Sequence, residues 1–173
     1  VEIAPECRDN IVKVRQWIEE NWMRPDAPPI YGFTTGLGKL KDSRIDTKQS
    51  ATFQLNVIKS HCGQFGDPLP EEVVRAAMLV RVNLFCRGVC GLRIETVARL
   101  LEMVTKRVHP LVPTLGTVGC SGDLGPLAHI VSAMIGFEKA EAIYEGVRMP
   151  AREALKKAGM SESFTLQAKD ALA

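Results

Sequence analysis

The sequence lacks the features of a membrane-spanning, exported or nucleic-acid-binding protein. No apolar stretch reaches the roughly 18 residues that a membrane span needs, and the N-terminus VEIAPECRDN has no basic region followed by an apolar one. The charged residues are well mixed and give a formal net charge of +2, without a basic run interleaved with aromatics. We therefore expect a cytoplasmic protein that binds neither a membrane nor nucleic acid.

Cysteine is scarce and odd in number, which argues against a disulfide framework. The five cysteines are Cys7, Cys62, Cys86, Cys90 and Cys120. A chain of 173 residues that is 46% hydrophobic can bury a core without disulfides, so reduced thiols are expected. Cys86 and Cys90 are four residues apart on a predicted helix and have the spacing to share a metal. No second Cys or His pair has ligand spacing, which favours buried thiols and no metal.

Hydrophobic periodicity predicts a mainly α fold. Helices are predicted over residues 6–23, 47–61, 70–88, 94–108, 127–137 and 150–158. The predicted buried stripe of the third helix is Val73, Ala77, Val80 and Leu84, and the helix over 127–137 is so apolar that burial on all sides is expected. Residues 142–149 predict a small β-hairpin that turns at Glu145-Gly146.

The length of the chain predicts one domain, and its two ends predict that this domain is part of a longer protein. The chain begins at Val1 without an initiator Met and stops at Ala173 within the helix-like stretch LQAKDALA, which has no helix stop signal. We expect an N-terminal piece of a longer protein.

The most unusual segment is GTVGCSGDLGP, from Gly116 to Pro126. One interpretation is a loop-to-helix junction, with Asp123 as the N-cap and Pro126 in the first turn. A serine-hydrolase elbow is disfavoured because G-x-S-x-G requires glycine where Asp123 stands. A third interpretation uses backbone chemistry: the amide nitrogen of Gly122 attacks the carbonyl carbon of Cys120, and Ser121 then loses its hydroxyl as water.

A glycine-rich loop, YGFTTGLG, runs from Tyr31 to Gly38. A phosphate-binding loop would require Ser or Thr after Gly38-Lys39, and a strand before the loop. Leu40 follows instead, and no strand pattern precedes the loop, so this interpretation is weak.

Three segments together resemble the histidine, tyrosine and phenylalanine ammonia-lyases and the related 2,3-aminomutases. They are YGFTTGLG at 31–38, NVIKSH at 56–61 and VGCSGDLGPLAH at 118–129, in the same order as in that family. The resemblance implies that residues 1–173 are the helical N-terminal domain of the ammonia-lyase (fumarase/aspartase-like) fold, without its C-terminal helical bundle. It also implies a homotetramer and a self-formed 4-methylidene-imidazol-5-one electrophile, with no external cofactor.

The resemblance assigns roles to individual residues. Ser121 would become the dehydrated centre of a ring that Cys120 and Gly122 close, with Cys120 in place of the family's usual alanine. Tyr31 would be the catalytic base, although a phenol has an ordinary pKa of about 10 and needs a neighbouring positive charge or dipole to ionise near neutral pH. His61 would line the pocket for the substrate side chain, where an imidazole suits histidine or tyrosine better than phenylalanine.

The remaining histidines and three arginines are expected to be structural. We interpret His129 as a satisfied core histidine and His109, before Pro110, as a turn residue. Arg81, Arg87 and Arg93 are expected to be partners of acidic side chains or helix carbonyls.

The predicted function is elimination of ammonia from an aromatic L-amino acid, with histidine favoured over tyrosine and phenylalanine. One rival is a 2,3-aminomutase, which re-adds the amine at the β-carbon. Another is a non-catalytic helical assembly domain that keeps the fold without the chemistry. Because the family's downstream active-site motifs lie beyond Ala173, residues 1–173 alone are expected to be inactive.

Overall fold

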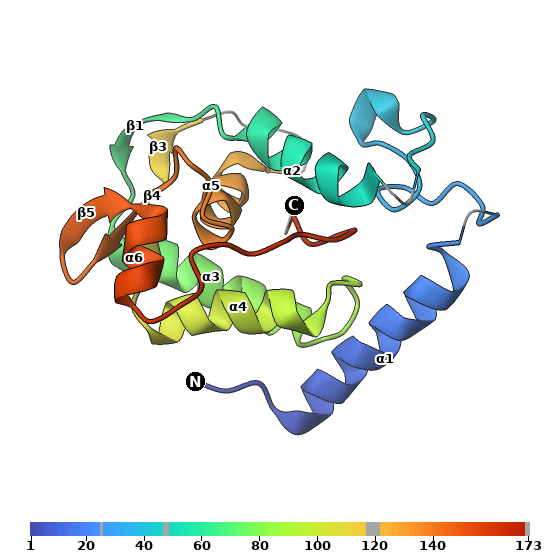
Figure 1. Ribbon diagram of the computed structural model, residues 1–173, viewed down its shortest axis with the longest axis horizontal. Helices are drawn as coiled ribbons and strands as arrows, with labels where there is room; N and C mark the ends of the chain where they lie inside the picture. The colour runs from blue at the N-terminus through green and yellow to red at the C-terminus, as the bar shows by residue number, and fades with distance from the viewer. Residues whose placement is uncertain (25, 47–48, 117–121, 172–173) are drawn as a thin grey trace.

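The computed structural model describes residues 1–24, 26–46, 49–116 and 122–171 (Figure 1). Its helices are α1 (Pro5–Asn21), the 3-10 helix η1 (Gly38–Leu40), α2 (Ser50–His61), α3 (Glu71–Phe85), α4 (Ile94–Thr105), α5 (Gly125–Met134) and α6 (Ala151–Lys157). Its strands are β1 (Phe65–Pro68), β2 (His109–Pro110), β3 (Pro113–Leu115), β4 (Glu141–Tyr144) and β5 (Val147–Pro150). The prediction of a mainly α fold is confirmed. None of the helices described is long and apolar enough to cross a membrane.

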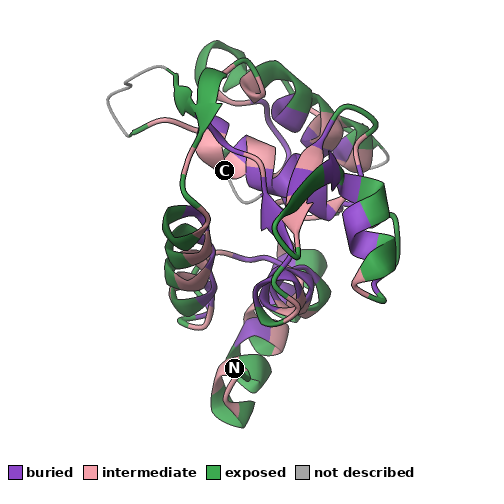
Figure 2. Ribbon diagram, turned by 90° about the vertical axis from the view of Figure 1, so that its left-hand side faces the viewer, coloured by how far each residue is buried: buried purple, intermediate pink, exposed green. Residues whose placement is uncertain are grey.

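The hydrophobic core lies where α3, α4 and α5 pack together, while α1 projects with much of its surface exposed (Figure 2). On α4 the buried residues include Val97, Leu101 and Val104, which recur at the helical spacing that predicts a helix over 94–108. Helix α5 is buried along most of its length, as its apolar composition predicts. Large side chains such as Leu100 and Met103 fill the interior, and burial of this kind supplies most of the stabilisation of a helical fold.

Helix α3 turns a different face to the core than the predicted one. Its buried residues are Val74, Met78, Val82 and Phe85, whereas Val73 and Val80 are 45% and 70% exposed. The helix is apolar on both faces, so periodicity alone does not select between them. The face that carries Met78 and Phe85 buries more apolar area, and this favours it.

The predicted hairpin is confirmed and belongs to a larger sheet. Glu145 and Gly146 have φ values of 52° and 75°, the left-handed pair that a two-residue turn between antiparallel strands requires. Strand β2 adds to β4, giving the order β2-β4-β5, and His109 pairs with Ile143. The prediction that His109 is a turn residue is therefore wrong. Its side chain is largely buried, and Nε2 lies 3.3 Å from a carboxylate oxygen of Glu71.

The last described segment is not helical, contrary to the helix-like pattern of LQAKDALA. After α6 the chain runs back between α2 and α4 and ends in a turn at residues 168–171 (Figure 1). The side chain of Asp170 accepts a hydrogen bond from the Gln167 amide at 2.8 Å. This amide is thereby satisfied within a turn, whereas in a helix it would donate to a backbone carbonyl of the preceding turn.

Candidate active site

Tyr31 lies on a tightly wound loop between α1 and α2. The Ile30 carbonyl accepts hydrogen bonds from the amides of Phe33, Thr34 and Thr35 at 3.0 to 3.3 Å. Gly32 follows Tyr31 with a φ of 71°, a conformation that glycine adopts without steric cost. The Tyr31 side chain is 59% exposed, and its hydroxyl oxygen accepts a hydrogen bond from the Gly38 amide at 3.2 Å. The loop therefore presents a phenol to solvent with a backbone donor on its oxygen.

His61 is the last residue of α2. Its Nδ1 lies 2.8 Å from the Val57 carbonyl oxygen and 3.0 Å from the Ser60 hydroxyl. A proton on Nδ1 satisfies the carbonyl, which leaves Nε2 as the acceptor. Nε2 makes no hydrogen bond to the residues that the structure describes.

The predicted electrophile-forming tripeptide lies only partly within the described residues: Cys120 and Ser121 fall outside them. Gly122 has a φ of 95°, and a Cβ built there would have no atom of the described residues within 4 Å, its chain neighbours aside. The left-handed backbone at position 122 thus favours glycine. The predicted ring closure also needs glycine there, because its nitrogen must be unhindered. The described residue fits the predicted group.

Both ends of this loop approach one glutamine. A Cβ built at Gly116 or at Gly125 would lie 2.5 Å from the Nε2 atom of Gln64, so a side chain at either position would displace that of Gln64. Gln64 donates a hydrogen bond to Asp123 at 2.8 Å. Asp123 also accepts one from the Gly125 amide at 2.9 Å, and so caps α5 from one position before the N-cap residue, Leu124.

His129 is not the satisfied core histidine that was predicted. Its Nε2 is buried without a hydrogen-bond partner among the described residues. Burial lowers the pKa of His129 below its ordinary value, opposed by the charge of Asp123. His129 lines a cavity of about 500 Å³ together with Cys62 and Ser132. Here burial raises the pKa of the Cys62 thiol, and a hydrogen bond from Ser132 opposes that shift.

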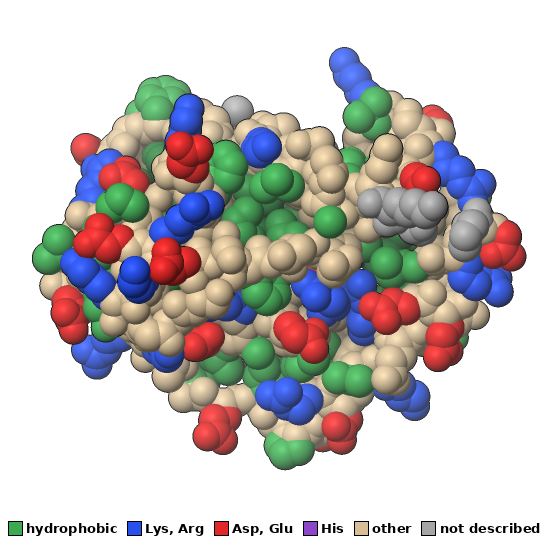
Figure 3. Space-filling view, viewed as in Figure 1, with side chains coloured by type: hydrophobic (Ala, Val, Ile, Leu, Met, Phe, Trp, Pro, Cys, Tyr) green, Lys and Arg blue, Asp and Glu red, His purple; other side chains and the backbone are tan. Residues whose placement is uncertain are grey.

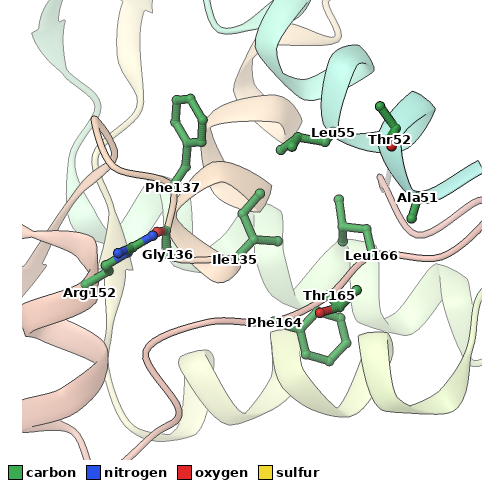
Figure 4. Close-up of a pocket in the computed structure, with 10 residues that line it drawn as sticks. All are labelled: Ala51, Thr52, Leu55, Ile135, Gly136, Phe137, Arg152, Phe164, Thr165 and Leu166. Carbon is green, nitrogen blue, oxygen red and sulfur yellow. The ribbon is translucent and has the colours of Figure 1, made fainter. Parts of the chain in front are cut away.

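A second cavity, of about 370 Å³, opens on the face drawn in Figure 3. Apolar side chains of α2, the end of α5 and residues 164–166 surround it, as Figure 4 shows. Its one charged residue, Arg152, donates to the Gly136 carbonyl at 2.6 Å. Tyr31, His61 and Gly122, the predicted site residues that the structure describes, do not line this cavity.

Sequence reasoning missed a cluster of buried charges beside the Tyr31 loop. Asp170 is fully buried and pairs with Arg93 at 2.6 Å, which confirms the predicted acidic partner of Arg93. Arg15 is buried in α1, where it stands between Ile11 and Ile18. A charged residue on the apolar side of an amphipathic helix is the signal that points to such a cluster.

The described residues give no further support for a metal-binding site. No group of three or more His, Cys, Asp or Glu side chains among them is placed to hold a metal ion. Cys7, Cys62, Cys86 and Cys90 are free thiols, and Cys120 lies outside the described part of the chain.

Solved structures that share this fold include lyases and aminomutases. Ergothionase from Treponema denticola, solved with desmethyl-ergothioneine sulfonic acid, superposes with a TM-score of 0.90 at 31% identity, over 99% of this chain and 33% of that one. Phenylalanine aminomutase from Pantoea agglomerans superposes with a TM-score of 0.88 at 29% identity, over 97% and 31% of the two chains.

Sequence comparison identifies the family. The model of the family described as aromatic amino acid lyase matches residues 1–173. Histidine ammonia-lyase from Caldanaerobacter subterraneus subsp. tengcongensis is 43% identical over 173 residues, which are all of this chain and 33% of that protein. The chain belongs to the aromatic amino acid lyase family, and it spans about a third of the length of the curated relatives it matches.

Proposed function

We propose that the complete gene product containing this chain is an ammonia-lyase that eliminates ammonia from an aromatic L-amino acid, with histidine as the favoured substrate. The observation that carries the proposal is the match of the entire chain to histidine ammonia-lyase at 43% identity. The motif positions Tyr31, His61 and Ser121 lie within the matched residues.

The electrophile is proposed to form from the chain itself. Gly122, with its left-handed backbone and open surroundings, supplies the nitrogen that closes onto the Cys120 carbonyl, and Ser121 supplies the hydroxyl that leaves. The resulting methylidene-imidazolone supplies an electrophilic carbon for the substrate amine. The Cys120 side chain is not consumed in either step.

The other two residues act on the substrate. Tyr31 removes a proton from the β-carbon, and the hydrogen bond from the Gly38 amide favours the phenolate that performs this step. His61 contributes to the pocket for the substrate side chain, with Nε2 as the group that accepts a hydrogen bond from an imidazole or phenol.

A second function, 2,3-aminomutase, uses the same residues and is favoured by the similarity to phenylalanine aminomutase. The two activities differ in product: an α,β-unsaturated acid from the lyase, a β-amino acid from the aminomutase. Product analysis with the complete gene product separates them. We also propose a homotetramer, as the family resemblance implies, which the mass of the native assembly tests.

The mass of the complete gene product tests the electrophile. It should be lower than the sequence mass by two water molecules, one lost in ring closure and one in dehydration. Ser121→Ala has no hydroxyl to lose, so its mass should lie at most one water below its own sequence mass, and turnover should be lost. Ser161→Ala, at an exposed turn, should keep the loss of two waters and normal turnover. Lyase activity from a protein of full sequence mass would exclude the mechanism, and full mass without activity would favour the assembly-domain alternative.

Substrate ranking tests His61. His61→Leu should shift preference from histidine or tyrosine towards phenylalanine, because the pocket loses a polar partner. An unchanged ranking would remove His61 from the pocket.

A further inference from the structure

The turn before the end of the described chain is built around the buried Asp170. Its carboxylate accepts hydrogen bonds from Arg93 Nε at 2.7 Å and from the Gln167 amide at 2.8 Å. Asp170 also donates its own amide to the Gln167 carbonyl at 3.0 Å. These contacts fix the two residues on either side of Ala168 and Lys169.

The neighbours of Lys169 are anchored as well. Arg15 Nη1 donates to the Ala168 carbonyl at 2.7 Å, and the Ala171 amide donates to the Gln54 side chain at 3.0 Å. Lys169 itself has a φ of 69°, a conformation that costs a non-glycine residue about 1 kcal/mol or more and persists where its surroundings impose it. The turn therefore holds Lys169 in one orientation.

The Lys169 side chain extends over the glycine-rich loop. Its Nζ lies 5.5 Å from the centre of the Phe33 ring and 3.6 Å from a Cβ position built at Gly32, the residue after Tyr31. Within the described part of the chain, Lys169 makes no hydrogen bond or ion pair with a carboxylate. A half-buried ammonium thus faces the loop, and no carboxylate of the described residues neutralises it.

The titratable groups that face Lys169 are Tyr31, Cys90 and Arg81. Burial lowers the pKa of Lys169 below its ordinary value, the ionised forms of Cys90 and Tyr31 raise it, and Arg81 lowers it. Lys169 Nζ thus lies beside the loop that carries Tyr31, where an ammonium attracts negative charge.

We propose that Lys169 is a positioning residue for the base Tyr31, and that its ammonium stabilises the phenolate from one side of the loop. The Gly38 amide, which donates to the phenol oxygen, supplies a second stabilising contact. Together they provide the positive charge that a tyrosine base needs near neutral pH. The inference rests on the proposed role of Tyr31 as the base.

The test compares four variants of the complete gene product by the pH dependence of kcat/KM. Lys169→Met should move the acid limb of the profile up by about one to three pH units, the range that one opposite charge produces, with activity recovering at high pH. Lys169→Arg should keep the limb near its original position because the charge is retained. Lys106→Met removes a lysine that contacts Glu102 and Gly159, so its profile should be unchanged. Tyr31→Phe should lose turnover at every pH.

A direct measurement of phenol ionisation complements the kinetics. The ultraviolet titration signal that Tyr31→Phe removes belongs to Tyr31, and Lys169→Met should shift this signal to higher pH. An unshifted signal and acid limb in Lys169→Met would overturn the inference while leaving Tyr31 as the base. Activity lost at all pH values and not restored by Lys169→Arg would also overturn it, because Lys169 would then carry a proton or hold the fold. Near-normal turnover of Tyr31→Phe would instead refute the proposed base.

Discussion

The molecule has two interiors of different character. Between α3, α4 and α5 the interior is mainly apolar, and Val97, Leu100 and Met103 are fully buried there. Beside the Tyr31 loop it is polar: Arg15 and the Arg93–Asp170 pair join α1, the start of α4 and the last described turn. The apolar interior gains free energy from buried area without demanding a particular direction of contact. The polar interior fixes directions, because each hydrogen bond requires its own geometry.

This difference matches the tasks of the two regions. A hydrophobic core tolerates exchange of side chains of similar volume. A loop that holds the proposed base Tyr31 would require positions accurate to a fraction of an ångström, which buried and fully paired polar groups supply. We therefore expect substitutions in the polar interior to alter both stability and turnover, and substitutions in the apolar interior to alter stability alone.

Loss of the buried carboxylate should have the largest effect. Asp170→Ala leaves Arg93 without its carboxylate partner and should lower the free energy of unfolding by about 3–5 kcal/mol. Denaturant unfolding measures the loss. Asp42→Ala is the matched control, since its ion pair with Lys41 is exposed and should contribute about 0–1 kcal/mol. Equal effects of the two substitutions would remove the distinction between buried and exposed charge pairs.

Truncation of a side chain in the apolar core should have the next largest effect on the free energy of unfolding. Leu100→Ala removes a fully buried side chain and should lower the free energy of unfolding by about 2–5 kcal/mol, depending on how far the cavity collapses. Val80→Ala, at a mostly exposed position, should change it by less than about 0.5 kcal/mol. In the complete gene product, Leu100→Ala should retain its kcat below the unfolding transition. A fall in kcat comparable to that of a polar-interior variant would contradict the comparison.

Replacement of Arg15 should have a smaller effect on stability. Its Nη1 donates to the carbonyls of Gly91 and Ala168, and Arg15→Met keeps the apolar stem but leaves both acceptors unpaired. A loss of about 1–3 kcal/mol is expected in denaturant unfolding. Arg8→Met, on the exposed face of the same helix, provides the control. Equal stability of the two variants would show that the carbonyls find other partners.

The smallest expected effect is on pH dependence. Burial lowers the pKa of His109, Glu71 opposes this shift, and Arg75 and Arg107 add to it. The unfolded chain therefore takes up a proton first, so the stability from neutral His109 is present above about pH 6.5 and is lost over the interval below that pH, down to the lowered pKa of the folded state. His109→Gln should flatten the decline in unfolding free energy over that interval. An identical decline in both proteins would assign it to other groups, such as His129.

The sequence predicted those features of the fold that local patterns of residues determine. The stripe of α4, the buried α5 and the hairpin turn at Glu145-Gly146 follow from periodicity and turn chemistry within a few residues. The face of α3 was mispredicted because both of its faces are apolar. His109 belongs to a strand only because β4 pairs with it, and no local pattern contains that information.

The candidate site divides in the same way. The motifs identify Tyr31, His61 and the tripeptide at 120–122 because each is a contiguous segment. The placement of Lys169 against the Tyr31 loop depends on contacts from Arg15, Gln54 and Arg93, which lie far from it in sequence. Only the tertiary structure brings these groups together.

The approach of Gly116 and Gly125 to the same glutamine bears on the proposed ring closure. A Cβ atom built at either glycine would lie 2.5 Å from Gln64 Nε2, so both glycines lie close to one side chain. Two chain positions held near each other in the folded protein need no further loss of loop-closure entropy to stay there. In the proposed mechanism, this part of the entropy cost would be spent in folding rather than in the reaction of the Gly122 nitrogen with the Cys120 carbonyl.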